Sequence, residues 1–346
     1  MINSVDVSVV VQGAIDKKNT PKCLKSIRKF LPDAEIVLST WENSDVEGLD
    51  YDILVLNQDP GGYKHDFALI NNKSSINNFN RQLISTCAGV LKSDRKYCLK
   101  LRSDLILKNS KFLNYWNGFE LQNNKYKLFS HRVICSSIYS RENSCCITGN
   151  GLPTPFHPSD FWFFGVTEDL KKYFCSSSLQ TLVEASNWKF KYPNRLPYSS
   201  MLWRYAPEQS FCVNWVKKYY PDLQFDDWSD WNPQNIELSN NILYNNFIFL
   251  DYEQSGIYSK KHSWAIKNKD RIQGLITYRH FQEQYKNYCD NAYHIDDSIK
   301  ADYVGKLCKH FNNVSKPFFY INKWFSEVCS VVYYAFIAIL KGWKQK

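Results

Sequence analysis

Residues 74–107 read SSINNFNRQLISTCAGVLKSDRKYCLKLRSDLIL, and this stretch predicts a helix that leads into a buried strand. Ser75 is a suitable N-cap, and apolar residues recur every three to four positions after it. After a polar break, the short apolar run Tyr97–Leu101 predicts a mostly buried strand that ends in Arg102 and Asp104. The apolar face of the helix consists of Ile76, Phe79, Leu83, Cys87, Val90 and Leu91.

The charged residues Arg102 and Asp104 at the end of this strand are the first candidate site. In an open α/β sheet, ligands bind beyond the carboxyl ends of the strands. An arginine there can fork onto a phosphate, and an aspartate can bind a metal ion or a hydroxyl. The pair therefore suits a phosphorylated ligand, and the alternative is an ion pair that only closes the end of the strand.

Three apolar runs before residue 74 predict further strands of the same sheet, at 5–11, 34–40 and 51–56. Thr20–Pro21 predicts the start of a helix between the first two. Neighbouring parallel strands must be joined by a crossover connection, which is usually a helix. The order of these elements therefore indicates an α/β fold with a mostly parallel sheet and right-handed crossovers. No G-x-G-x-x-G follows the first run and the sequence has no Walker lysine loop, which disfavours a dinucleotide dehydrogenase and a P-loop kinase.

Two more carboxylates of interest follow in the second half of the chain. Asp160 precedes the apolar run 161–165, which predicts a buried strand, and its alternative role is to cap the turn before that strand. Glu208 lies in the first turn of a predicted helix, where an acid is favourable to the helix dipole whatever its function. The basic segment 258–269 is either a phosphate-facing surface or a solvated one.

The composition restricts the partners. The 346 residues carry a formal charge of +9, which favours nucleotide phosphates, nucleic acid or an acidic lipid surface. Eleven cysteines without a C-x-x-C pair argue against a zinc ribbon and a secreted disulfide framework, so we expect reduced thiols in the cytoplasm. Residues 1–6 do not have the pattern of a secretion signal.

The C-terminal region contains two apolar runs, 318–321 and 328–340, with Trp and Lys residues around them. The longer run is too short for the roughly 20 residues that span a bilayer. Trp and Lys at its margins instead predict a helix that lies at a membrane interface. The alternative is a helix packed on the core or on a second subunit.

Several segments between residues 9 and 160 resemble, in their order, the WavE family of lipopolysaccharide-synthesis proteins. The resemblance implies a GT-A-like (Rossmann-like) glycosyltransferase fold, a nucleotide-sugar donor and a lipid-linked or lipopolysaccharide or capsule saccharide as acceptor. It also implies a location at the cytoplasmic face of the inner membrane. The segments are Val9–Gly13, Asp59–Gly61, Asn80–Gln82 with Ser85 and Thr86, Lys100–Leu105, and His157–Asp160.

GT-A enzymes bind Mn²⁺ or Mg²⁺ with an Asp-x-Asp motif, and the matching tripeptide here is Arg102-Ser103-Asp104. The first acid is absent. Asp104 then either binds a metal with the help of phosphates and water, or Arg102 neutralises the phosphate and no metal is needed. A CMP-linked donor of the sialic-acid type suits the second alternative, because it has one phosphate fewer.

The resemblance also implies roles for single residues. An inverting enzyme needs a base for the acceptor hydroxyl, and Glu208 is the first candidate; Asp160 is the second, as base or as an acceptor for sugar hydroxyls. Retention of configuration needs no such base. The expected donor-pocket residues are Gln12, Asp59 for the base or ribose, Asn80, and Arg81 for phosphate.

We therefore expect a GT-A-like domain at 1–285, with a nucleotide-binding half at 1–110 and an acceptor half at 111–285, followed by a helical segment at 286–346 that contacts the membrane surface. Two alternatives of other classes are a basic, aromatic-rich nucleic-acid-binding protein and a catalytically inactive membrane scaffold. Dispersed basic residues and the lack of an RNA-binding motif disfavour a nucleic-acid partner.

Overall fold

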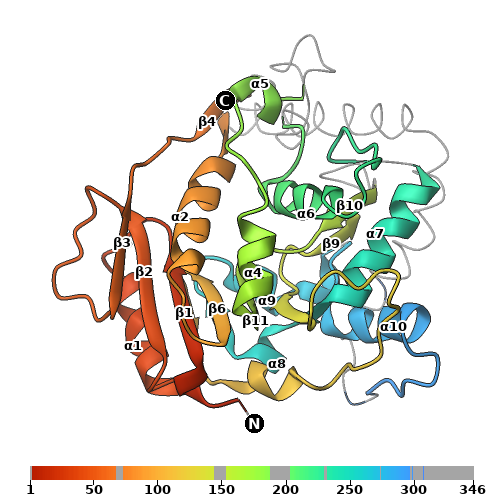
Figure 1. Cartoon of the computed structure of the whole chain (residues 1–346), viewed down its shortest axis with the longest axis horizontal. Coiled ribbons are helices and arrows are strands. Elements are labelled where there is room, and N and C mark those ends of the chain that lie inside the picture. Colours follow the sequence, from red (N-terminus) through yellow and green to blue (C-terminus); the bar gives the residue numbers. More distant parts are fainter. Residues whose placement is uncertain are drawn as a thin grey trace, which may run out of the picture.

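The computed structural model describes residues 2–67, 73–143, 153–187, 203–229, 232–272, 274–296, 298 and 307. Within them, one sheet of seven strands forms the centre of the molecule (Figure 1). Its strands, in spatial order, are β12 (Phe247–Leu250), β8 (Val133–Ser136), β11 (Trp162–Val166), β6 (Tyr97–Arg102), β1 (Val7–Gln12), β2 (Glu35–Trp41) and β3 (Ile53–Asn57).

The sheet is mostly parallel, as the order of the predicted elements indicates. β1 pairs in parallel with β2 and β6, β2 with β3, and β8 with β12. β11 is antiparallel to both of its neighbours, β6 and β8. The amino end of β11 therefore lies at the same edge as the carboxyl ends of the parallel strands.

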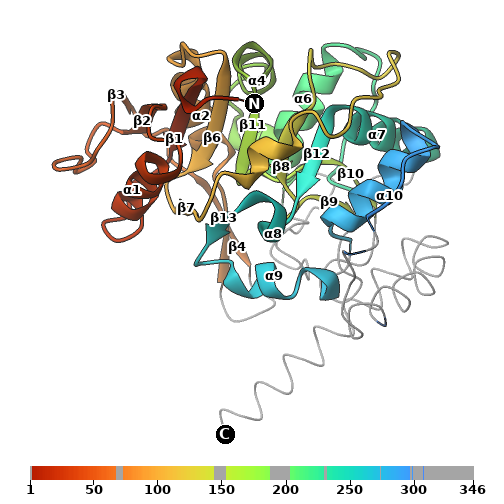
Figure 2. The same cartoon turned by 90° about the horizontal axis from the view of Figure 1, so that it is seen from below.

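Helices cover both faces of the sheet. α2 packs on β1 and β2, and α4 packs on β11 and β6. Figure 2 shows α4 and α6 on one side of the sheet and α1, α8 and α9 on the other. The helices are α1 (Thr20–Phe30), α2 (Phe79–Leu91), α4 (Thr167–Phe174), α5 (Leu182–Ala185), α6 (Pro207–Lys217), α7 (Pro233–Asn246), α8 (Tyr252–Ser255), α9 (Ser263–Lys267) and α10 (Tyr278–Tyr288).

Short elements complete the described part of the chain. The strand pairs are β4 (Tyr63–Phe67) with β5 (Lys73–Asn77), β9 (Arg141–Asn143) with β10 (Pro153–His157), and β7 (Leu105–Leu107) with β13 (Ile257–Ser259). The 3-10 helices are η1 (Ser4–Asp6), η2 (Lys111–Tyr115) and η5 (Lys269–Arg271).

The predicted start of the helix before β6 is wrong. Ser75 lies in β5, where its hydroxyl accepts a hydrogen bond of 2.8 Å from the Trp203 indole, and α2 begins at Phe79 after Asn78. Ile76 is 54% exposed and so lies outside the apolar face of the helix. The polar residues around it suit a hairpin whose partner, β4, has little apolar pattern of its own.

The expectation of reduced thiols is also contradicted at one pair. Cys87 of α2 and Cys175, which caps α4, form a disulfide across 88 residues of sequence. The two helices pack side by side, and sequence spacing alone does not show this proximity. The apolar runs 318–321 and 328–340 lie outside the described residues.

Candidate functional site

The candidate site lies at the carboxyl edge of the sheet, where four central strands deliver side chains. Gln12 ends β1, Trp41 ends β2 and Arg102 ends β6. Because β11 is antiparallel, the residues before it reach the same edge, and the Arg102 amide donates to the Phe161 carbonyl at 3.3 Å. Asp160 is thus placed beside Arg102 by strand direction.

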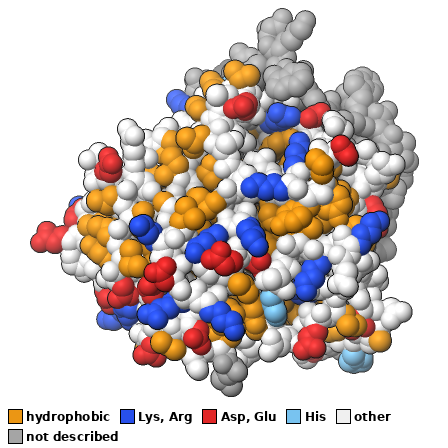
Figure 3. All heavy atoms as spheres, in the orientation of Figure 1, with side chains coloured by type: hydrophobic (Ala, Val, Ile, Leu, Met, Phe, Trp, Pro, Cys, Tyr) orange, Lys and Arg blue, Asp and Glu red, His pale blue; other side chains and the backbone are white. Residues whose placement is uncertain are grey.

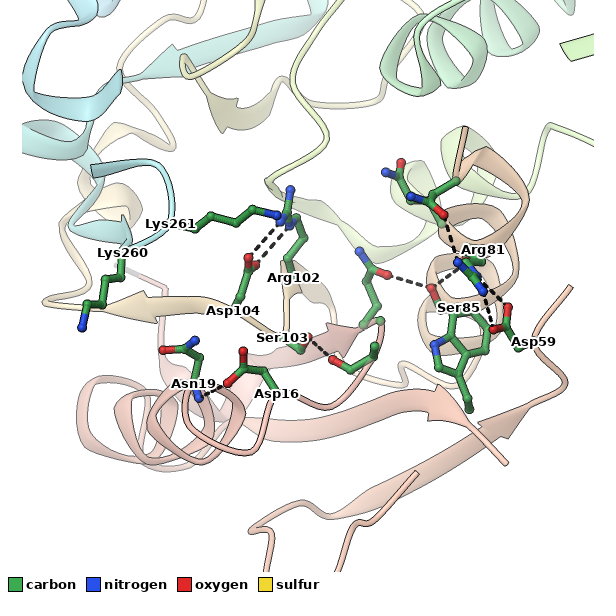
Figure 4. A pocket seen from close by; sticks show the side chains of 16 residues that line it. Asp16, Asn19, Asp59, Arg81, Ser85, Arg102, Ser103, Asp104, Lys260 and Lys261 are labelled. Atoms are coloured by element: carbon green, nitrogen blue, oxygen red, sulfur yellow. Dashed lines mark hydrogen bonds and ion pairs between the residues drawn. The ribbon is translucent and has the colours of Figure 1, made fainter. Parts of the chain in front are cut away.

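A cavity of about 570 Å³ opens at this edge (Figure 4). Gly13 begins its wall directly after β1 with φ of +108°, a backbone conformation that favours glycine. The lining residues come from the ends of β1, β2 and β6 and the residues after them, from the loop after β3, from α2 and its N-cap, and from the loop before α9. They are Gln12, Gly13, Ala14, Asp16, Asn19, Trp41, Asp59, Asn78, Arg81, Gln82, Ser85, Arg102, Ser103, Asp104, Lys260 and Lys261.

Arg102 and Asp104 form a bidentate ion pair in the cavity wall. Arg102 Nε and Nη2 donate to the two Asp104 carboxylate oxygens at 3.1 and 2.8 Å, and both side chains are mostly buried. The guanidinium also lies 4.7 Å from the centre of the Phe161 ring. Burial disfavours its charge, but the Asp160 and Asp104 carboxylates outweigh this and raise the pKa of Arg102. Arg102 is therefore a fixed cation at the end of β6.

A second ion pair lies across the cavity, between Arg81 of α2 and Asp59 of the loop after β3. Arg81 Nε and Nη2 donate to the two Asp59 oxygens at 2.8 Å each, and this pairing lowers the pKa of Asp59. Gln12 is held by Ser85, whose hydroxyl donates to the Gln12 side-chain oxygen at 2.7 Å. These contacts fix the orientation of three predicted donor-pocket residues.

The cavity has an excess of positive charge. Its third carboxylate, Asp16, accepts hydrogen bonds from the backbone amides of Lys18 and Asn19, which lower its pKa. Lys260 and Lys261 are exposed and make no ion pair with any described residue. Figure 4 shows Lys261 extended toward Arg102 and Asp104. Two lysines thus remain for an anionic ligand.

The described residues contain no preformed site for a divalent metal ion. They contain no group of three or more His, Cys, Asp or Glu side chains arranged for one. Asp104, the predicted ligand, has both carboxylate oxygens engaged by Arg102, so a metal would have to displace a charge-assisted bidentate pair.

Beside the cavity, Glu208 and Asp160 lie in a mostly buried charged cluster that also contains Lys100 and His157. Burial and the neighbouring Asp160 raise the pKa of Glu208, at the first turn of α6, to about 8. The Lys100 ammonium donates to the Asp160 backbone carbonyl, and burial lowers the pKa of Lys100 to about 8. Neither Asp160 nor Glu208 lines the cavity itself, but both carboxylates raise the pKa of Arg102.

His157 completes this cluster as a neutral side chain. Its Nε2 atom lies 4.0 Å from Glu208 Oε2, which is too far for a hydrogen bond. Burial lowers the pKa of His157 to about 3, so the contact is no ion pair near neutral pH. Its Nδ1 is buried and has no hydrogen-bond partner among the described residues.

The structure brings five of the predicted residues into the cavity: Gln12, Asp59, Arg81, Arg102 and Asp104. Asn80 is not among the lining residues, because its amide makes two hydrogen bonds with the backbone of Gln180, at 2.8 and 2.9 Å. Sequence reasoning missed Trp41 and Asp16. Trp41 directly follows the predicted strand 34–40 and ends the observed β2, so the rule for carboxyl ends was a sufficient signal for it.

None of the described helices has the length and apolar character needed to cross a membrane. On the face drawn in Figure 3, Lys and Arg side chains are interspersed with Asp and Glu rather than gathered in one basic patch. This face therefore does not have the extended basic groove that non-specific nucleic-acid binding needs.

The solved structures that this chain matches include two of LgtC. The galactosyltransferase LgtC in complex with donor and acceptor sugar analogues is 12% identical, with a TM-score of 0.32, over 71% of this chain and 73% of that one. An active-site mutant of LgtC is 10% identical, with a TM-score of 0.35, over 89% and 95%. A search of curated proteins found no match.

The sequence profile for WavE lipopolysaccharide synthesis matches residues 7–312, which include every strand of the central sheet and the whole cavity. The expected resemblance is therefore confirmed over most of the chain. The chain belongs to the WavE lipopolysaccharide-synthesis family.

Proposed function

We propose that this chain is a glycosyltransferase of lipopolysaccharide synthesis that works at the cytoplasmic face of the inner membrane. It moves a sugar from a nucleotide-sugar donor to a hydroxyl of a lipid-linked or lipopolysaccharide saccharide. The observation that carries this proposal is the cavity and the group beside it. The cavity has two lysines, Lys260 and Lys261, that form no ion pair with a described carboxylate, and the mostly buried Glu208 beside it has a pKa of about 8. The family membership gives the pathway.

The cavity suits the nucleotide part of the donor. Arg102, Lys260 and Lys261 are the cations available to the phosphates, and Arg102 is held in place by Asp104. Trp41, at the end of β2, suits stacking with the base. Asp59, in the loop after β3, suits hydrogen bonding to the ribose or the base. Because the phosphate charge is neutralised by side chains, the proposed donor site works without a divalent metal.

Glu208 is the proposed base. Its carboxylate takes the proton of the acceptor hydroxyl while the hydroxyl oxygen bonds to the anomeric carbon. The bond from that carbon to the phosphate oxygen breaks, and the nucleotide leaves with the electron pair. A base with a pKa near the working pH is well matched to this transfer. The anomeric configuration is inverted, which NMR of the product tests directly. Asp160 either shares the proton or accepts from a sugar hydroxyl.

A thermal-shift panel tests the donor site. UDP, GDP, CMP, CDP and dTDP are each added with Mn²⁺ and with chelator. A ligand at a hundred times its dissociation constant stabilises the fold by about 2.7 kcal/mol. We expect one nucleotide to raise the Tm equally in both conditions. Stabilisation by CMP alone identifies a sialic-acid-type donor. No shift with any nucleotide, together with a shift caused by single-stranded RNA, contradicts the transferase proposal.

The variant Asp104→Asn separates the two roles of Asp104. If Asp104 only holds Arg102, nucleotide binding persists and stays independent of metal, because the substituted amide leaves the guanidinium in the wall. If it is a metal ligand, the nucleotide shift needs Mn²⁺ in the parent and is lost in the variant. Asp94→Asn, at an exposed aspartate outside the cavity, is the matched control because it makes the same change of charge and side chain.

A further inference from the structure

Four exposed residues lie at and beside the cavity. Two of them are the cavity lysines, and the other two have no role in the proposed sugar transfer. We call Lys260, Lys261, Trp264 and Lys267 the basic tryptophan patch. Trp264 is 68% exposed, which is unusual for this large side chain, and the three lysines are also exposed. None of the three lysines makes an ion pair with a described residue.

The patch is held in place by the body of the molecule. Its helix, α9, buries Ala265 and Ile266, which are 3% and 6% exposed, and α9 packs against β13. Trp264 therefore lies on an anchored helix, with its ring on the side away from the buried residues. Figure 2 shows α9 at the margin of the described part of the molecule, away from α4 and α6.

The charge around the patch has one sign. Residues 258–272 include five Lys or Arg residues and a single acid, Asp270. Two nearby acids, Asp251 and Glu253, are both taken by Lys269, at 3.3 and 2.6 Å. Among the described residues, no carboxylate lies within ion-pair distance of the patch lysines. These lysines therefore face solvent with their charge uncompensated.

We propose that the basic tryptophan patch docks this protein on an anionic phospholipid bilayer. A tryptophan ring is favourable at the level of the lipid headgroups, and lysines beside it are attracted to anionic lipids. A single aromatic side chain among lysines fits a lipid interface better than it fits single-stranded nucleic acid, which is bound by several successive stacking rings.

The position of the patch has a consequence for the acceptor. Lys260 and Lys261 belong both to the patch and to the cavity wall, so a bilayer in contact with Trp264 lies at the cavity mouth. A lipid-linked saccharide then reaches the donor sugar without leaving the membrane. This consequence rests on the proposed function, whereas the docking itself does not.

Vesicle co-sedimentation of the full chain, without nucleotide, tests the docking. We expect binding to vesicles of mixed phosphatidylcholine and phosphatidylglycerol that weakens with salt, and little binding to phosphatidylcholine alone. The double variant Trp264→Ala/Lys267→Glu should lower the partition constant about tenfold. The matched control Leu91→Ala/Lys92→Glu, at an exposed apolar residue and an exposed lysine at the end of α2, should bind like the parent.

A local measurement excludes the contribution of other segments. Hydroxyl-radical oxidation of Trp264, followed by mass spectrometry, should fall when anionic vesicles bind, while oxidation of the exposed Tyr219 of the chain should not. Unchanged oxidation of Trp264 on bound vesicles overturns the proposal, and so does equal vesicle binding by the double variant. Loss of single-stranded RNA binding alone in that variant would assign the patch to nucleic acid instead. Failure of the nucleotide panel leaves these results unaffected.

Discussion

At the scale of single residues, Glu208 destabilises the fold when its carboxyl group is ionised, and the same ionised group is the base in the proposed reaction. Its side chain is 18% exposed, and its carboxyl group lies near Asp160 and has a pKa of about 8. A carboxyl group with a raised pKa is a recurrent property of catalytic acids and bases. The same property also occurs in structural clusters, so its role needs a kinetic test.

The first prediction concerns transfer activity. Glu208→Gln should lower kcat by about 10²- to 10⁴-fold, the usual contribution of a general base, with nucleotide binding unchanged. In the parent, kcat/KM should rise with pH up to about 8, because only the ionised carboxylate accepts the proton. Glu168→Gln, at an exposed first-turn glutamate of α4, is the matched control. Measurable activity of Glu208→Gln equal to that of the parent would favour a retaining mechanism, whereas no transfer by either protein would favour an inactive scaffold.

The second prediction concerns stability, which should change with pH in the opposite direction to kcat/KM. Folded Glu208 keeps its proton up to pH 8, whereas the unfolded chain releases it near pH 4.5, so this group loses stabilising effect as the pH rises between the two values. Glutamine does not titrate. The Tm of Glu208→Gln relative to the parent should therefore increase from pH 4.5 to pH 8 and then level off. A difference in Tm that is constant with pH would show that the environment of Glu208 does not raise its pKa.

At the scale of elements, the disulfide between α2 and α4 supports a prediction. α2 also carries Arg81 and Ser85, which line the cavity, so the bond restrains one wall of the site. Cys175→Ser should lower the free energy of unfolding by up to about 4 kcal/mol, since a loop of this length is no longer closed in the unfolded chain. Urea unfolding with and without reductant measures it.

The variant supplies its own control. Reductant should lower the stability of the parent to that of Cys175→Ser and should leave the variant unchanged. A parent whose unfolding is insensitive to reductant would mean that the thiols are reduced in solution, in agreement with the expectation from the sequence.

The elements also show which parts of the site are accessible to sequence reasoning. β1, β2, β3 and β6 are largely apolar runs, and the rule for carboxyl ends then places Gln12, Arg102 and Asp104 at one edge. Asp160 reaches that edge only because β11 runs antiparallel, and strand direction leaves no trace in an apolar run. Ser75 is a good helix cap by its type, but pairing between β4 and β5 outweighs this local preference.

At the scale of the whole molecule, the sheet joins the two halves that we expected at 1–110 and 111–285. β6 of the first half pairs with β1 on one side and with β11 of the second half on the other. The assignment of nucleotide binding to the first half and of the acceptor to the second half stays a prediction. For folding, the shared sheet indicates one cooperative unit among the described residues.

The fourth prediction follows from this shared sheet. Unfolding in urea should show a single transition, with the same midpoint by tryptophan fluorescence and by far-ultraviolet circular dichroism. Trp41 reports on the first half, and eight tryptophans between residues 111 and 285 report on the second. Two transitions with separate midpoints would show instead that the halves unfold independently and that the β6–β11 pairing is weak.

The Arg102–Asp104 pair also bears on cell physiology. In the proposed site, the positive charge that meets the donor phosphates is part of the polypeptide and is present from the moment the chain folds. If the donor binds there without a metal, as proposed, the enzyme would not compete for scarce manganese. Under manganese starvation, a bacterium that depends on it would continue this step of envelope assembly while metal-requiring transferases slow down.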